Sequence, residues 1–161
     1  NMANIFITSD THFHHTNIIK YCNRPFSSTA EMDEILIQNW NKVVKPGDKI
    51  YHLGDVYFPQ KEKSDWLFGR LNGSKRLILG NHDSGKDQTL LKYFKEIYMW
   101  RFLKEFGLLL THVPVHPDSL SSKLKYNVHG HIHNRLSPKG PYKNACVEMN
   151  NYTPRPIEDF M

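Results

Sequence analysis

The chain is organised around the stretch Leu77-Ile78-Leu79-Gly80-Asn81-His82-Asp83. Its apolar beginning predicts a short strand, which ends abruptly in a glycine, an amide, an imidazole and a carboxylate. Such side chains are costly in a core, but at the edge of a sheet they can face a metal ion or a phosphate. A plain polar turn also favours Asn and Asp. The function of the stretch therefore depends on whether other polar motifs in the chain accompany it.

Four other polar clusters follow apolar or β-prone segments along the chain. They are Asp10-Thr11-His12, Gly54-Asp55, Thr111-His112 and Gly130-His131-Ile132-His133. Polar residues that follow successive strands tend to converge at one edge of a sheet. We therefore expect the five clusters to supply one another's missing partners in a single site.

The ordered set D-x-H, G-D, G-N-H-D, H and G-H-x-H resembles the calcineurin-like metallophosphoesterase superfamily. All five motifs are present in order, from Asp10 to His133. The segment from Thr8 to Phe26 resembles the small bacterial and bacteriophage phosphoesterase branch. The resemblance implies a four-layer αββα sandwich, with two sheets face to face and helices outside. The residues by themselves indicate a mixed α/β (α+β) chain.

Composition sets the broad class of the protein. The chain has 161 residues, and we expect a single domain over 1–161. Asn1 ahead of Met2 is interpreted as a leftover of expression. No apolar run approaches the roughly 20 residues of a membrane helix, and no signal-peptide pattern opens the chain. The cysteines, Cys22 and Cys146, lack C-x-x-C spacing, so we expect a reducing, cytoplasmic location and no membrane partner.

Periodicity and turn signals predict alternating strands and helices in the first half and a mainly antiparallel set of strands in the second. Ser28 and Glu31 form a predicted capping box. We expect the third and fourth helices to bury Trp66 and Leu91. Strands are expected at 4–9, 49–53, 76–79, 97–104, 108–111, 126–129 and 145–149, with 97–104 and 108–111 as a hairpin. Helices are expected at 18–21, 28–44, 61–71 and 87–94.

Seven side chains of the motifs offer oxygen or imidazole nitrogen, and none offers a thiolate: Asp10, His12, Asp55, Asn81, His112, His131 and His133. This mixture suits Mn, Fe, Co, Ni or Zn. Seven ligands are too many for one tetrahedral zinc, whereas a bridging carboxylate would let them hold two ions. We favour two manganese ions as cofactors, with Ni, Co, Fe and Zn as alternatives.

The resemblance implies a division of labour among these residues. The ligands implied for the first metal are Asp10, His12 and His133. The ligands implied for the second metal are Asn81, His112 and His131. Asp55 is implied to bridge both ions, a metal-bridging hydroxide to attack phosphorus, and His82 to act as the catalytic proton donor. The protein-phosphatase branch orients this histidine with an Asp, but Phe58 stands at that position here, which argues against that branch.

The resulting prediction is a dinuclear-metal phosphoesterase that hydrolyses a phosphodiester, or less favourably a phosphomonoester. Its expected partner is a small phosphorylated or nucleotide-like substrate, and Arg24 and His14 are candidate substrate-binding residues. A nuclease acting on DNA or RNA ends is an alternative. The net charge of +5 favours it, but no basic stripe appears. A catalytically silent metal-binding scaffold is a second alternative. The sequence gives no prediction of the oligomeric state.

Several further residues carry weaker expectations. His52 and His129 lie inside predicted strands, where we expect packed core histidines. His116, between prolines, could line the mouth of a pocket. Asp83 is expected either to hydrogen-bond a ligand histidine or to cap the following turn.

Overall fold

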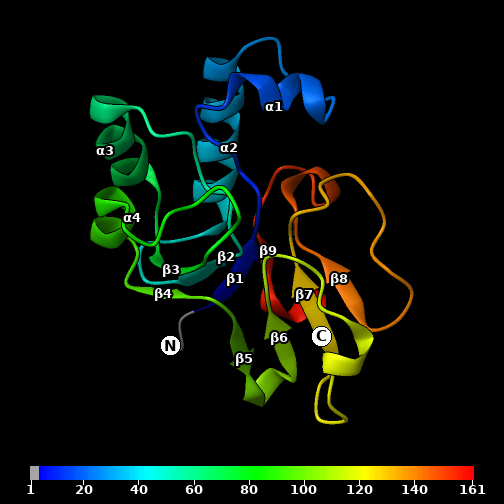
Figure 1. Ribbon diagram of the computed structural model, residues 1–161. Helices are drawn as coiled ribbons and strands as arrows, with labels where there is room; N and C mark the ends of the chain where they lie inside the picture. The colour runs from blue at the N-terminus through cyan, green and yellow to red at the C-terminus, as the bar shows by residue number, and fades with distance from the viewer. Residues whose placement is uncertain (1–3) are drawn as a thin grey trace.

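Two β-sheets pack face to face, and α-helices cover the first of them (Figure 1). The structure is a computed structural model that describes residues 4–161, so Asn1 and the expectation about it lie outside the described residues. The mixed α/β class expected from the sequence is confirmed.

The first sheet has the strand order β4-β3-β2-β1-β9. Its strands are β1 (Ile5–Thr8), β2 (Lys49–His52), β3 (Ser74–Ile78), β4 (Glu96–Tyr98) and β9 (Arg155–Pro156). Strands β1 to β4 are parallel, and β9 pairs antiparallel with β1. The C-terminal ends of β1, β2 and β3 therefore lie at one edge, and these are the ends that three of the polar motifs follow.

The helices are α1 (Thr16–Tyr21), α2 (Thr29–Val43), α3 (Lys61–Arg70) and α4 (Gln88–Tyr93). Ser28 caps α2 by accepting a hydrogen bond from the Glu31 backbone N–H at 3.1 Å. The predicted capping box is only half formed, because the Glu31 carboxylate returns to the hydroxyl of Ser27 and not to the backbone of Ser28.

Strand alternation builds two cores from the first sheet. Phe6, Ile50 and Leu77 face the helices and pack with residues of all four of them. The next residue on β1, β2 and β3 faces the opposite way and packs with the second sheet. The short apolar strands are therefore buried on both faces, as parallel strands in α/β proteins are.

The second sheet has the order β5-β6-β7-β8. Its strands are β5 (Arg101–Leu103), β6 (Leu108–Leu110), β7 (Tyr126–His129) and β8 (Tyr142–Asn144). Only β5 and β6 are antiparallel, whereas β6, β7 and β8 are parallel. The expectation of a mainly antiparallel second half is therefore wrong, because the connections between these strands are long crossovers and not tight turns.

Other boundaries differ from the expectation. The predicted strand 97–104 divides between sheets, since its first part lies in β4 and its second part forms β5. The predicted strand 145–149 contains the 3₁₀ helix η3 (Val147–Met149), and β8 precedes it. Trp66 is 53% exposed and Leu91 48% exposed, so both predicted burials are wrong. The buried stripe of α3 is formed by Leu67 and Phe68, and Arg70 stacks on the solvent-facing indole.

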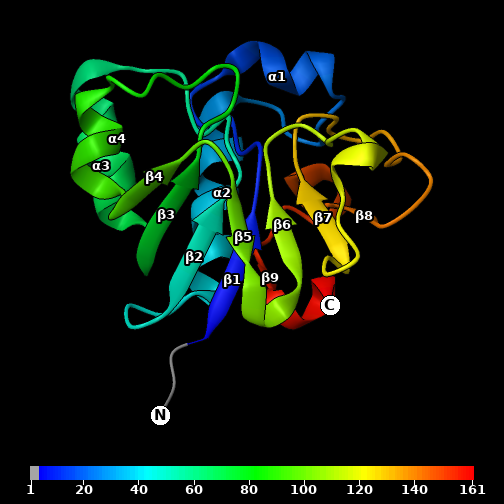
Figure 2. The ribbon, with the colours of Figure 1, turned by 60° about the horizontal axis from the view of Figure 1, so that its bottom comes forward.

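The outer face of the second sheet is lined by segment 113–125 and its 3₁₀ helix η2 (Pro117–Ser119), as the turned view shows (Figure 2). Two further 3₁₀ helices, η1 (Lys104–Phe106) and η4 (Ile157–Phe160), follow β5 and β9. Within residues 4–161, no helix has the length and apolar character needed to cross a bilayer.

Candidate metal centre

The five polar motifs meet where the strands of both sheets end. Backbone hydrogen bonds tie the loops together: the Asp10 N–H donates to Gly54 O at 2.9 Å, and the His12 N–H donates to Asp55 O at 3.1 Å. On the second sheet, the Gly130 N–H donates to His112 O at 2.8 Å. Backbone hydrogen bonds alone thus fix the segments that carry the motifs to one another.

The first group of candidate ligands comprises Asp10, His12 and His133. Asp10 Oδ1 lies 3.8 Å from His12 Nε2 and 3.7 Å from His133 Nε2. Two atoms that bind one ion at about 2.1 Å lie about 3–4 Å apart, so these separations fit a shared metal. Asp10 Oδ1 and His12 Nε2 are buried and have no hydrogen-bond partner among the described residues. A metal ion would satisfy both atoms, which are otherwise costly to bury.

The second group comprises Asn81, His112 and His131, together with Asp55. Asn81 Oδ1 lies 2.8 Å from His112 Nε2 and 3.1 Å from His131 Nδ1. Since His112 Nδ1 donates to Leu53 O at 2.7 Å, the neutral ring turns the lone pair of Nε2 toward the amide oxygen. Two lone pairs so close together require a proton or a metal ion between them.

Asp55 joins the two groups. Its Oδ2 lies 3.6 Å from His12 Nε2 and 3.4 Å from His112 Nε2. Its Oδ1 is turned away and accepts the backbone N–H of His82 at 2.9 Å. One carboxylate oxygen thus faces both candidate metal positions, as the expected bridging role requires.

The backbone at the centre is held in an unusual conformation. Five of the seven candidate ligands have left-handed φ values between 50° and 76°: Asp10, His12, Asp55, His131 and His133. Each such non-glycine residue costs of the order of 1 kcal/mol or more, and such residues cluster where function requires them. The strain places successive ligands at angles that a regular strand or helix would not allow.

Two glycines allow the ligands to lie close to the backbone. A Cβ atom on Gly130 would overlap the side chains of Ser9 and Asp10, and one on Gly80 would overlap the carboxylate of Asp55. Both glycines stand directly before a candidate ligand in the sequence. The G-H-x-H and G-N-H motifs therefore need glycine because of close approach.

The electrostatics of the centre favour ionised carboxylates. Burial alone would raise the pKa of Asp10, but the His12 imidazole, whose Nε2 lies 3.8 Å from Oδ1, and the charges of His112 and His133 outweigh it and lower the pKa to about 2. For Asp55, burial is likewise outweighed by the imidazoles of His112 and His12, whose Nε2 atoms lie 3.4 and 3.6 Å from Oδ2, and the pKa is lowered. Both carboxylates are thus ready to bind cations near neutral pH.

Glu148 is a functional residue that the sequence reasoning missed. Its Oε2 accepts a hydrogen bond from His133 Nδ1 at 2.9 Å, which turns Nε2 toward Asp10. Burial lowers the pKa of His133, but the neighbouring Cys22 and the hydrogen-bonded carboxylate of Glu148 outweigh this and raise it to about 10. No local signal marks Glu148, because it lies in a 3₁₀ turn 15 residues after its partner.

Arg24 does not reach the solvent side of the centre, contrary to its expected role in binding substrate. Its side chain is fully buried and pairs with Glu148 at 2.9 Å. Its guanidinium also donates to the carbonyl oxygens of Thr11 at 2.7 Å and Asp10 at 2.6 Å. The residue therefore fixes the strained loop after β1 and neutralises Glu148.

His14, the other expected substrate contact, also points elsewhere. Its backbone N–H donates to Asp33 Oδ1 at 3.0 Å, its ring faces Asp33, and it lines a separate pocket beside α2 and α3. The neighbouring His15 lies beside the candidate metal centre, with its Nδ1 3.2 Å from His12 Nδ1. The His15 ring stacks on Phe58. His15 and not His14 faces the centre, and the backbone at His14 is left-handed at this point.

His82 lies exposed at the mouth of the centre. Its ring is 5.7 Å from that of His12, centroid to centroid. Within residues 4–161, no side chain hydrogen-bonds its imidazole, in keeping with the replacement of the orienting Asp by Phe58. The backbone of His82 is fixed by the hydrogen bond from its N–H to Asp55 Oδ1.

The remaining candidates have structural roles. His52 is buried and hydrogen-bonds the Thr11 hydroxyl, and burial lowers its pKa to about 3. His129 is also buried. His116 is exposed and caps η2. Asp83 accepts the backbone N–H groups of Asp55, Val56 and Gly80 at 2.8–3.1 Å, so it joins two ligand loops. Within the described part of the chain, its carboxylate hydrogen-bonds no ligand histidine.

Comparison with known proteins places the chain in a family. No protein-family model matches it. It is 39% identical to an uncharacterized protein of Methanocaldococcus jannaschii, over 95% of this chain and 86% of the relative. The chain belongs to the same family as this archaeal protein.

Other relatives extend this family. A solved structure of a protein of unknown function from Aquifex aeolicus aligns with a TM-score of 0.78 and 30% identity, over 98% of this chain and 97% of that chain. The gene 66 protein of Mycobacterium phage L5 is 34% identical over 51% of this chain and 41% of its own length. The names of these proteins state no activity.

Proposed function

We propose that the chain is a calcineurin-like metallophosphoesterase that hydrolyses a phosphate ester, preferably a diester, at a dinuclear metal centre. The observation that carries this proposal is the position of Asp55 Oδ2, 3.6 Å from His12 Nε2 and 3.4 Å from His112 Nε2. It stands between two groups of converging ligand atoms. The full motif set of the superfamily thus has a geometry that suits two ions.

Two divalent ions, when bound, would polarise phosphoryl oxygens and lower the pKa of a bound water to about 7. Asp10 and Asp55 supply two negative charges against the four positive charges of such ions. The centre would therefore stay net positive and attract a phosphate. The four ligand histidines add no charge when they bind as neutral imidazoles, which keeps this balance.

His82 is our proposed proton donor. It is exposed at the mouth, where a leaving group would depart, and its backbone is fixed to Asp55. An imidazole titrates near neutral pH and can protonate a departing alkoxide. The ring of His15 lies 5.3 Å from that of His12, centroid to centroid, so it is available to contact the substrate in place of His14.

The complete ligand set supports turnover over a silent scaffold. The small phosphorylated or nucleotide-like substrate and the preference for manganese are parts of the proposal. A nuclease would need a basic track that leads to the centre, and the residues that line the adjoining pocket include no lysine or arginine.

The test is a hydrolysis screen with metal-stripped protein. Mn, Ni, Co, Zn, Fe or Mg is added in turn, with paired aryl phosphate monoester and diester substrates. Metal-dependent release that is faster on the diester supports the proposal. Faster release on the monoester replaces the diesterase with a phosphatase, and no release by any metal from folded protein contradicts hydrolysis.

The role of His82 has its own test. We expect His82→Ala to slow turnover about 100-fold or more while metal content, measured by plasma mass spectrometry, stays unchanged. His116→Ala is the matched control, because that histidine is exposed and lies on η2. If His82→Ala empties the centre, then His82 is a ligand and not a proton donor.

A further inference from the structure

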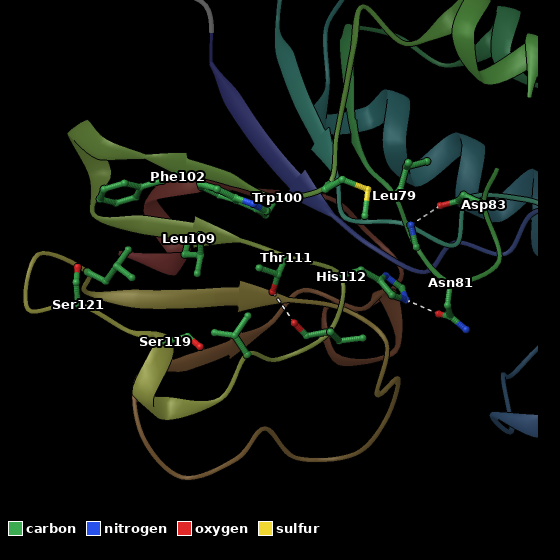
Figure 3. A pocket seen from close by; sticks show the side chains of 15 residues that line it. Leu79, Asn81, Asp83, Trp100, Phe102, Leu109, Thr111, His112, Ser119 and Ser121 are labelled. Carbon is green, nitrogen blue, oxygen red and sulfur yellow. Dashed lines mark hydrogen bonds between the residues drawn. The ribbon is translucent and has the colours of Figure 1, made fainter. Parts of the chain in front are cut away.

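A pocket of about 760 Å³ opens beside the second group of candidate ligands (Figure 3). Its floor is the outer face of β5 and β6, where Phe102 and Leu109 are cross-strand partners. Trp100 lines it from the β4–β5 connection, and segment 113–124 forms the opposite wall. The volume lies within the range of small-molecule sites, about 300–1,000 Å³.

The pocket is continuous with the metal centre. Asn81 and His112 line the pocket and also belong to the second ligand group. Figure 3 shows these two side chains at one end, with Phe102 and Ser121 toward the other. A substituent on a phosphate bound at the centre would therefore have a direct path along the outer face of β6.

The lining is apolar and offers no cation. Its largest exposed members are Met99 and Trp100, at 74% and 62% exposure, which are unusual values for such side chains. Among the described lining residues there is no lysine or arginine, so the pocket offers no fixed cationic side chain of this kind to a second phosphate. Its acidic member, Asp83, has its carboxylate occupied by backbone N–H groups. Trp100 and Phe102 supply aromatic faces that suit a flat ring.

The wall opposite Trp100 is fixed by a buried side chain. Asn127 is fully buried on β7; it accepts the Val115 N–H at 3.0 Å and donates to Leu109 O and the Thr111 hydroxyl at 3.0 and 2.9 Å. The Tyr142 hydroxyl donates to Val115 O at 2.7 Å. These bonds hold segment 113–115 beside the floor, so this part of the wall is in place without a ligand and loses little entropy on binding.

We propose that this pocket binds an uncharged aromatic substituent of the phosphoester substrate while its phosphate lies on the metal centre. The substrate class is then a phosphate ester of a flat aromatic group, such as a nucleobase-bearing or aryl alcohol. This inference rests on the proposed function, because the centre anchors the phosphate.

The test is calorimetric binding to metal-loaded protein, so it does not depend on turnover. The probes are methylphosphonate, octylphosphonate and 1-naphthylmethylphosphonate. We expect the naphthyl compound to bind at least tenfold more tightly than methylphosphonate (about 1.4 kcal/mol) and more tightly than the octyl compound. Trp100→Ala and Leu109→Gln should each remove most of that advantage without changing methylphosphonate affinity. Trp66→Ala is the matched control on the far side of the first sheet.

The outcomes separate this inference from the proposed function. Equal affinity of all three phosphonates would overturn the aromatic pocket while leaving the phosphate site intact. Tighter binding of the octyl compound would overturn the aromatic class in favour of an acyl chain. An advantage that survives Trp100→Ala and Leu109→Gln would place the ring elsewhere. Binding of none of the probes would overturn both the inference and the phosphate-binding centre on which it rests.

Discussion

The two halves of the metal centre differ in burial and in support. The first half, Asp10, His12 and His133, has a fully buried carboxylate and ligand atoms without partners, and the Glu148–Arg24 pair supports it from behind. The second half holds the exposed Asn81 and the half-buried His131 beside the apolar pocket.

This contrast indicates different tasks for the two halves. In the first half, Asp10 Oδ1 and His12 Nε2 are buried without a hydrogen-bond partner among the described residues, so this half suits a firmly held metal. The ligands of the second half already contact one another and lie next to open space. They suit an ion that shares its coordination with a substrate.

The largest effect is expected from Asp55→Asn, which weakens the link between the halves. Because Oδ2 faces both halves, the affinity for both ions should fall more than about 100-fold, beyond the loss typical of residues that only support a ligand. Metal titrations and metal content per chain measure this. Asp118→Asn, an exposed carboxylate on η2, is the control. Loss of one ion alone would show that Asp55 does not bridge.

Glu148→Gln should act on the first half alone. Glutamine keeps an oxygen that can accept from His133 but lacks the negative charge, so the hydrogen bond that orients His133 weakens, and the affinity for one ion should fall about 10–100-fold. The buried guanidinium of Arg24 also loses its counter-charge, which should lower the free energy of unfolding of the metal-free protein by about 3 kcal/mol. Urea unfolding and metal titration measure the two effects, with the exposed Glu105→Gln as control. Equal weakening of both ions would contradict a divided centre.

Asp83→Ala should loosen the side of the centre that carries Asp55 and Asn81. Three backbone N–H groups lose their acceptor, and the free energy of unfolding should fall by about 2 kcal/mol. The affinity for the second ion should fall more than that for the first. Urea unfolding of Asp83→Ala beside Asp118→Ala gives the stability difference, and an equal loss at both ions would break the predicted order.

Asp33→Asn tests a site outside both halves and has the smallest expected effect. Burial raises the pKa of Asp33 to about 6, above its ordinary 3.8, despite the hydrogen bond from the His14 backbone. The folded protein therefore holds this proton more tightly, and stability falls as the pH rises from about 4 to about 6.

Asp33→Asn should remove about 1–2 kcal/mol of this loss of stability between low and neutral pH. The free energies of unfolding of the variant and the wild type at pH 4 and pH 7 measure the effect. The affinities for both ions should not change. A fall that persists in Asp33→Asn would assign the pH dependence to another group.

The sequence predicted most of the first sheet because local rules decide it. Short apolar runs, Ser28 before α2 and polar residues after each strand are contiguous signals, and the seven ligand types follow directly from the motifs. The second sheet was misjudged because a parallel strand pair has no turn signature. The chain between Ile97 and Leu103 crosses from one sheet to the other without a glycine or proline to mark the change.

The sequence alone therefore determined the chemistry of this protein: which side chains could bind metal, and that histidines, carboxylates and one amide would supply the ligands. Only the tertiary structure decided their supports and surroundings. Glu148 comes to His133, Arg24 turns inward and Asn127 fixes the pocket wall through contacts between segments distant in sequence. Such contacts depend on how two sheets pack, and packing leaves no local pattern in the chain because many sequences can fill the same space.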